Sequence, residues 1–163
     1  MKNFNDFVIL HLTQQFYSDY PLSDYPQILR KDERPYTVFT VKIDGLDFAI
    51  PFRSHIKHNH AFITDNRNPE DKCGLDYTKA VIITNQKYID YQSQPRLRSH
   101  EHNVLKGNES KIIGGFKSYL NRYKRAAKRP DVERNKQFCR FSALQYFHKE
   151  LKTSASASST KRN

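Results

Sequence analysis

The clearest hydrophobic pattern in the chain lies between Pro35 and Pro51. Apolar or β-branched residues alternate with their neighbours on both sides of the pair Asp44-Gly45. An alternation with period two predicts strands, and Asp-Gly fits the two-residue turn of a β-hairpin. Proline lacks the N–H that a sheet ladder needs, so we expect Pro51 to end the return strand. The hairpin then delivers the chain directly into the segment FRSHIKHNH, residues 52–60.

A second pattern, with helical spacing, covers residues 111–128. Apolar side chains recur there every three to four positions, which predicts an amphipathic helix with one face on a core. Pro130 is expected to stop this helix. The basic residues that lie mainly outside its apolar stripe include Lys117, Lys124, Arg125 and Lys128.

Weaker patterns predict the remaining elements. With 163 residues, the chain is long enough for one domain with its own core. Residues 152–163 are rich in Ser, Ala and Thr and predict a flexible low-complexity tail. The other expected elements are a strand over 6–12, a helical turn and loop over 14–25, a polar loop over 65–76, a buried strand over 79–84 that could pair with 87–91, and a last short helix over 143–151 capped by Ser142.

The charge of the chain indicates what kind of partner it binds. Its net charge is +11, although residues 1–50 hold five Lys/Arg against seven Asp/Glu. All of the excess positive charge therefore lies beyond residue 50, which suits a binding face for a polyanion such as nucleic acid better than general solubility. No apolar stretch is long enough to span a bilayer, the N-terminus does not read as a signal peptide, and two cysteines without a CxxC partner predict reduced thiols. We therefore expect a cytoplasmic protein without a membrane contact.

Residues 53–60 contain every group that metal-free RNA cleavage needs. A base removes the 2′-hydroxyl proton, an acid protonates the departing 5′-oxygen, and cations or hydrogen-bond donors hold the phosphorane. Histidine can serve as either proton carrier near neutral pH, and arginine binds phosphate in a bidentate manner. The residues concerned are Arg53, Ser54, His55, Lys57, His58 and His60.

Other interpretations of these segments stay open. The 53–60 segment could be a solvated basic loop that only contacts phosphates, or His55, His58 and His60 could ligate zinc together with Cys73, although the spacing HxxHxH matches no tight zinc pattern. The basic face of the 111–128 helix could follow an RNA backbone, bind DNA without specificity, or simply face solvent. The tyrosines of SDYPLSDYP, and Tyr36, could stack on unpaired bases or pack at the edge of the core.

Several segments together resemble the TenpN branch of type III toxin–antitoxin toxins, which is related to ToxN and AbiQ. The resemblance spans about residues 6–151. Its most specific parts are the two long segments that begin with GLD. The segments that carry it are DYP, ERPY, GLDFAIPFRSHIKHNH, GLDYTKAVII and LQYFHKEL.

The resemblance implies a fold, an activity and partners. The fold would be α+β, with a twisted, mainly antiparallel sheet flanked by helices, in a single compact domain over residues 1–151. The activity would be an endoribonuclease that needs no metal or other cofactor and leaves a 2′,3′-cyclic phosphate. Such a toxin cleaves cellular mRNA and processes the repeats of its own antitoxin RNA. The resulting pseudoknot RNA stays bound, inhibits the toxin, and closes with it into a cyclic assembly.

The resemblance also places the family motif on particular residues. Its Pro, apolar residue, Thr-Ser and nearby Lys fall on Pro51, Phe52, Arg53, Ser54 and Lys57, so that Arg53 replaces the family's Thr. Ser54 and Lys57 would orient and neutralise the scissile phosphate, and Arg53 would stabilise the developing charge. The motif includes none of the histidines, whose roles rest only on their chemistry.

The chain contains two sets of candidate residues. The rival functions are a non-catalytic RNA-binding protein and a basic DNA-binding regulator. The candidate catalytic residues are Ser54, Arg53, Lys57, His55 and His58. The candidate RNA-binding residues are Lys31, Arg34, Tyr36, His60, Lys117, Lys124, Arg125 and Lys128.

Overall fold

The predicted hairpin forms the centre of the sheet. Strands β2 (Thr37–Ile43) and β3 (Leu46–Arg53) pair in antiparallel register. Asp44 and Gly45 have φ angles of 53° and 81°, the positive values that a type I′ turn requires. The prediction that Pro51 ends the return strand is wrong, because β3 continues through Arg53. The extra residues are held by a neighbouring strand that the sequence did not reveal.

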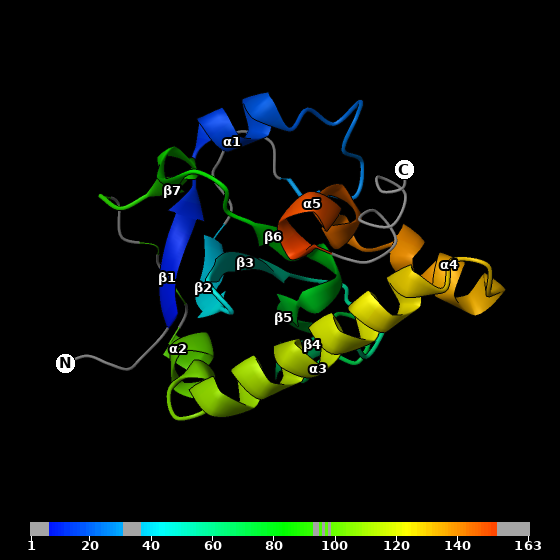
Figure 1. Cartoon of the computed structure of the whole chain (residues 1–163). Coiled ribbons are helices and arrows are strands. Elements are labelled where there is room, and N and C mark those ends of the chain that lie inside the picture. Colours follow the sequence, from blue (N-terminus) through cyan, green and yellow to red (C-terminus); the bar gives the residue numbers. More distant parts are fainter. Residues whose placement is uncertain (1–6, 31–36, 93–94, 96, 98, 153–163) are drawn as a thin grey trace.

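The computed structural model describes residues 7–30, 37–92, 95, 97 and 99–152, and shows an α+β domain (Figure 1). Its seven-stranded antiparallel sheet has the order β4-β5-β3-β2-β1-β7, with β6 also paired to β3. The fold class expected from the sequence is confirmed. The remaining strands are β1 (Phe7–Leu12), β4 (Ala61–Asp65), β5 (Cys73–Asp76), β6 (Val81–Ile82) and β7 (Ile89–Asp90).

The predicted pairing of residues 87–91 with 79–84 is wrong. β6 pairs with β3, whereas β7 pairs with β1. A 3-10 turn, η2 (Gln86–Tyr88), redirects the chain between them, and the side chain of Asn85 accepts the N–H of Lys87 at 2.9 Å to begin that turn. The turn brings Ile89 to β1, where its side chain is buried.

The long helix follows the predicted boundaries closely. It covers Glu109–Lys128 and ends just before Pro130, as expected. Ser142 caps the next-to-last element, but the helix predicted over 143–151 is divided into a 3-10 turn and a single α-turn. Among the described residues, no helix is long and apolar enough to cross a membrane. The helical elements are α1 (Gln14–Asp19), α2 (Ser99–Leu105), α3 (Glu109–Lys128), α4 (Glu133–Arg140), α5 (His148–Leu151), η1 (Tyr77–Lys79) and η3 (Ala143–Tyr146).

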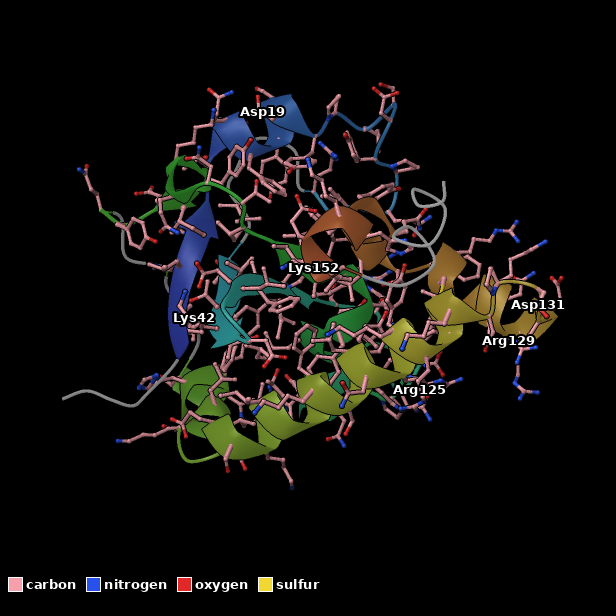
Figure 2. All side chains as sticks on the ribbon, viewed as in Figure 1. Asp19, Lys42, Arg125, Arg129, Asp131 and Lys152 are labelled. Carbon is pink, nitrogen blue, oxygen red and sulfur yellow. The ribbon has the colours of Figure 1, made fainter. Side chains whose placement is uncertain are left out.

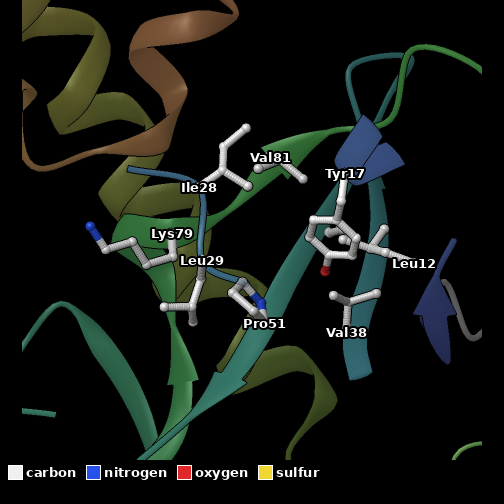
Figure 3. Close-up of a pocket in the computed structure, with 9 residues that line it drawn as sticks. Leu12, Tyr17, Ile28, Leu29, Val38, Pro51, Lys79 and Val81 are labelled. Atoms are coloured by element: carbon white, nitrogen blue, oxygen red, sulfur yellow. The ribbon is translucent and has the colours of Figure 1, made fainter. Parts of the chain in front are cut away.

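Both faces of β3 are covered. On one face, Phe48 packs against Phe116 of α3 with ring centroids 5.1 Å apart. On the other face, Ala49 and Pro51 line a small apolar cavity below α1 (Figure 3). This double coverage explains why β3 is buried over four consecutive residues and does not alternate between buried and exposed side chains. Complete burial of a side chain such as Phe116 contributes about 2–3 kcal/mol.

Strand β5 lies within the segment that was expected to be a polar loop. Gly74 pairs with Arg53 on one side and with Ile63 on the other. A Cβ atom on Gly74 would lie 2.2 Å from the carbonyl oxygen of Phe62. Glycine therefore lets β4 and β5 approach closely, and the usual preference of strands for bulky side chains gives no signal here.

Gly74→Ala is expected to destabilise the protein by about 1–3 kcal/mol, because backbone atoms of β4 cannot rotate away as a side chain could. Gly114→Ala is the matched control, since a Cβ there meets nothing within 4 Å in the middle of α3. It should stabilise by up to about 1 kcal/mol through helix propensity. Urea unfolding of the two variants measures both effects, and equal stability of the two would contradict the close strand approach.

Candidate functional site

The site begins at a break in the sheet. β5 pairs with Phe52 and Arg53 of β3, and β6 pairs with Phe48 and Ala49 along the same edge. Between β5 and β6 the chain leaves that edge as η1. Pro51 lies opposite this break, where its missing N–H costs no ladder bond. The break brings η1 beside the last residue of β3.

Asp76, the last residue of β5, is the buried charge beneath the site. Its carboxylate is 0% exposed and lies 2.7 Å from Nη1 of Arg53, which donates to Oδ2. The backbone N–H and the hydroxyl of Thr78 donate to Oδ1 at 2.9 and 2.6 Å. Burial alone would raise the pKa of Asp76, but His58, Thr78 and Arg53 together lower it to about 2. The carboxylate is therefore charged at neutral pH and fixes the position of Arg53.

The loop between β3 and β4 separates the predicted residues into two groups. Ile56 in its middle is buried, and its N–H donates to the carbonyl of Lys72 at 3.0 Å. Ser54, His55 and Lys57 are exposed. The half-buried residues Arg53, His58 and His60 face the interior of the site.

The outward group forms its own small cluster. The N–H of His55 donates to Asp71 at 2.9 Å, and its ring lies 3.2 Å from the hydroxyl of Ser54. His55 adopts a φ of 56°, which is uncommon for a residue other than glycine. This turn directs Ser54 and His55 away from Asp76.

His58 is held at both ring nitrogens. Nδ1 accepts the backbone N–H of His60 at 3.0 Å. Nε2 lies 3.2 Å from Oδ1 of Asp76, at a distance typical of an ion pair but not in line for a regular hydrogen bond. Nδ1 is engaged by His60 and Nε2 is buried against Asp76, so neither nitrogen is open to a bound molecule.

His60 has a different environment. Its ring packs edge-on against Phe138 at 5.2 Å and beside Tyr119 at 5.9 Å, and its nitrogens bond to none of the described residues. Burial lowers the pKa of His60, the positive charge of Arg122 and the neighbouring His58 lower it further, and the Asp76 carboxylate partly opposes this shift. His60 is consequently neutral at pH 7 and able to accept a proton.

A cationic pocket of about 460 Å³ lies over these residues. None of its lining residues is acidic, because Asp76 lies beneath the surface. An electropositive hollow with arginine and lysine donors is suited to a phosphate group. The pocket is lined by Arg53, His58, His60, Thr78, Lys79, Arg122, Arg134, Gln137, Phe138 and Phe141.

Lys79 belongs to two environments at once. Its aliphatic stem lines the apolar cavity of Figure 3, while the ammonium points away from that cavity. The ammonium donates to Oε1 of Gln27 at 2.6 Å and to the carbonyl of Phe141 at 3.0 Å. Burial lowers the pKa of Lys79, Asp76 partly opposes this shift, and Arg53 adds to it. Lys79 is therefore a stronger acid than an ordinary lysine.

A second hollow, of about 380 Å³, lies on the other side of His60 and Arg122. Lys111, Ser118 and Arg122 of α3 line it. Ser118 follows Lys111 by seven residues and precedes Arg122 by four, so the three residues lie along one flank of the helix. This flank faces the site.

Most of the basic residues predicted on α3 lie on a different flank. Lys117, Lys124 and Lys128 are rotated roughly 120–160° from Arg122 about the helix axis, at 3.6 residues per turn. Arg125 is about 60° from Arg122 by the same arithmetic and is exposed (Figure 2). None of these four residues lines either hollow. Their role in RNA binding stays a prediction.

Some of the predicted residues cannot be placed. Lys31, Arg34 and Tyr36, which were predicted to bind RNA, lie outside the described residues, as does the predicted tail except for Lys152.

The structure also contains site residues that sequence reasoning missed. A usable signal existed for Asp76 and Thr78, because an acidic residue two positions before Thr is typical of an Asx turn. The residues missed are Asp76, Thr78, Lys79, Arg122, Arg134, Gln137, Phe138 and Phe141.

The described residues contain no group of three or more His, Cys, Asp or Glu side chains placed to hold a metal ion. The zinc alternative therefore has no ligand cluster, since His55 is directed to Asp71 and His58 to Asp76. Cys73 and Cys139 are free thiols.

Comparisons with models of known protein families, with curated proteins and with solved structures found no match to this chain.

Asp76→Asn is expected to lower the free energy of unfolding by about 3 kcal/mol at pH 7. The substitution removes the buried negative charge that pairs with the Arg53 guanidinium. The pKa of Asp76 is lower in the folded than in the unfolded chain, so its stabilisation is present above pH 4 and disappears as the pH falls towards 2. The difference between wild type and variant should shrink over that window in urea unfolding.

Asp131→Asn is the matched control. Asp131 also pairs with an arginine, Arg129, but both side chains are about two-thirds exposed (Figure 2). Its loss should change stability by less than about 1 kcal/mol. Equal effects of the two substitutions would show that Asp76 is not a central buried charge.

Proposed function

We propose that this chain is an endoribonuclease toxin of a type III toxin–antitoxin system, acting at the cationic pocket. The observation that carries the proposal is the neutral imidazole of His60 within a pocket lined by Arg53, Lys79, Arg122 and Arg134. A base and phosphate-binding cations in one hollow are the parts that RNA transesterification needs. The sequence resemblance to TenpN toxins independently supports the same chemistry.

In the proposed reaction, His60 takes the proton of the 2′-hydroxyl and the 2′-oxygen attacks phosphorus. Arg53 keeps Nη1 on Asp76 and offers its other N–H donors to the non-bridging oxygens. The bond from phosphorus to the 5′-oxygen breaks, and the Lys79 ammonium donates a proton to that oxygen. The products are a 2′,3′-cyclic phosphate and a free 5′-hydroxyl.

The other candidate residues have supporting roles in this proposal. His58 positions the 58–60 backbone by accepting the N–H of His60. Ser54, His55 and Lys57, on the outer side of the loop, contact the RNA strand as it leaves the pocket. The antitoxin RNA competes with cellular mRNA for the same surface, and the toxin and its RNA close into a cyclic assembly in the cytoplasm.

A second candidate function is an RNA-binding protein without catalysis. It is favoured by the engagement of both His58 nitrogens, which leaves His60 as the one unengaged imidazole among the described residues that line the pocket. A cationic pocket with a single base would bind RNA even if no group donated a proton to the leaving 5′-oxygen. The two functions differ in whether RNA is cut.

Purified protein incubated with single-stranded RNA and EDTA is expected to cut it and leave cyclic-phosphate ends. His60→Gln should slow cleavage at least about 100-fold, because the base is lost. His102→Gln, on the exposed side of α2, is the matched control and should cleave normally. RNA methylated at every 2′-oxygen lacks the nucleophile and should bind without being cut.

The same assay locates the active site. Ser54→Ala and Lys57→Ala should reduce cleavage less than His60→Gln does. If they abolish cleavage while His60→Gln remains active, the chemistry lies on the outer side of the loop. Binding without cleavage by the wild-type protein would leave the second candidate function.

The pH dependence gives a further test. Because the pKa of His60 lies below 6.5, the acidic limb of the pH–rate profile, where protonation of the base slows cleavage, should lie below pH 6.5. Arg122→Gln removes a nearby positive charge, which should raise the pKa of His60 and move that limb to higher pH. Lys117→Gln, on the opposite flank of α3, should leave the limb in place. A limb that does not respond to Arg122→Gln would argue against His60 as the base.

A further inference from the structure

Phe141 stands out among the aromatic residues of the chain. Its side chain is 55% exposed, and the large hydrophobic side chains that share this exposure among the described residues are Leu22 and Tyr91. Of these three, Phe141 alone lines the cationic pocket. An isolated exposed apolar residue is ordinary on a protein surface, but an exposed ring at a phosphate site has a specific chemical use.

The exposure of Phe141 is built into the backbone around it. Its carbonyl accepts the ammonium of Lys79 at 3.0 Å. The next residue, Ser142, is fully buried and its hydroxyl accepts the O–H of Tyr119 at 2.8 Å. The side-chain amide of Gln145 donates to the carbonyls of Arg140 and Ser142 at 2.8 and 2.9 Å. The backbone that carries the exposed ring is thus held by hydrogen bonds on both sides of Phe141.

Phe138, the other phenyl ring of the pocket, is already packed against neighbouring side chains. The guanidinium of Arg122 lies 4.3 Å from its ring centroid, and His60 and Tyr119 pack around it. Phe141 has one such neighbour, the guanidinium of Arg140 at 5.8 Å, and none of the other described aromatic rings packs on it. A face of the Phe141 ring is therefore open to a planar ligand.

We propose that Phe141 is a stacking platform for an unpaired nucleobase next to the phosphate held in the pocket. The proposal rests on the proposed function and narrows its substrate to single-stranded RNA, because a base stacked in a duplex cannot reach the ring. Every base has a π-face, so the platform contributes affinity without sequence preference. The cations of the pocket, Arg53, Lys79 and Arg134, bind the adjoining phosphate.

Binding of a fluorescent single-stranded decamer with 2′-O-methyl sugars, which cannot be cleaved, tests this platform separately from catalysis. Phe141→Ala should weaken binding about tenfold, as loss of one stacked base does. Phe141→Trp should bind at least as tightly as the wild type, and Phe141→Leu should resemble Phe141→Ala. Tyr91→Ala, which removes an equally exposed ring outside the pocket, is the matched control and should have no effect.

A set of decamers with one abasic position each shows whether a base is the partner. At one position the abasic substitution should weaken binding to the wild type about as much as Phe141→Ala does, and it should have no additional effect on Phe141→Ala. A fully paired duplex should bind independently of Phe141.

Each failure has a distinct meaning. If Phe141→Ala binds within twofold of wild type, or loses as much affinity for the duplex as for the single strand, the platform is wrong while the ribonuclease function stands. If the wild-type protein binds no oligonucleotide, the proposed function and the platform are both overturned.

Discussion

The buried charge of Asp76 is the constraint on which the functional region depends. A carboxylate without solvent contact is costly unless it is paired and hydrogen-bonded, and each of its partners here comes from a different part of the local chain. Arg53 ends β3, His58 belongs to the following loop, and Thr78 lies in η1. Satisfying one carboxylate therefore positions three segments at the break in the sheet. The charge that stabilises the site from beneath also leaves the lining of the pocket without an acidic side chain.

The electrostatic consequence is a division between a neutral base and fixed cations. His60 lies among Arg122, His58 and aromatic rings, which disfavour a charged imidazole. The orientation of the Arg53 guanidinium is set by its hydrogen bond to Asp76. A neutral base and a phosphate-binding cation can thus lie in one hollow. Burial lowers the pKa of the His60 imidazole, and the Asp76 carboxylate orients the Arg53 guanidinium. Such a division between neighbouring titratable groups is a common way for proteins to assign acid and base roles.

Local signals were sufficient for the central hairpin, the long helix and three of the residues that line the pocket. Asp44-Gly45 and the helical spacing of residues 111–128 express preferences of nearby residues, so the sequence predicts them well. β5 was missed because Gly74 is required by the backbone of β4, which is distant in sequence. Arg53, His58 and His60 were identified as a cluster, but their separation from Ser54, His55 and Lys57 depends on burial of Ile56 between them. Arg122 and Arg134 reach the pocket only through the packing of α3 and α4, which no local pattern encodes.

The bonds of Lys79 have a consequence for the order in which the protein becomes functional. Its ammonium joins Gln27, near the start of the domain, to the carbonyl of Phe141, near its end. The walls of the pocket are likewise contributed by residues from Arg53 to Phe141. The residues of the Asp76 cluster precede α4 in the chain, so during synthesis the pocket can be completed only after α4 and Phe141 have been added. A chain that ends before Phe141 would therefore lack both the complete pocket and the second bond of the Lys79 ammonium.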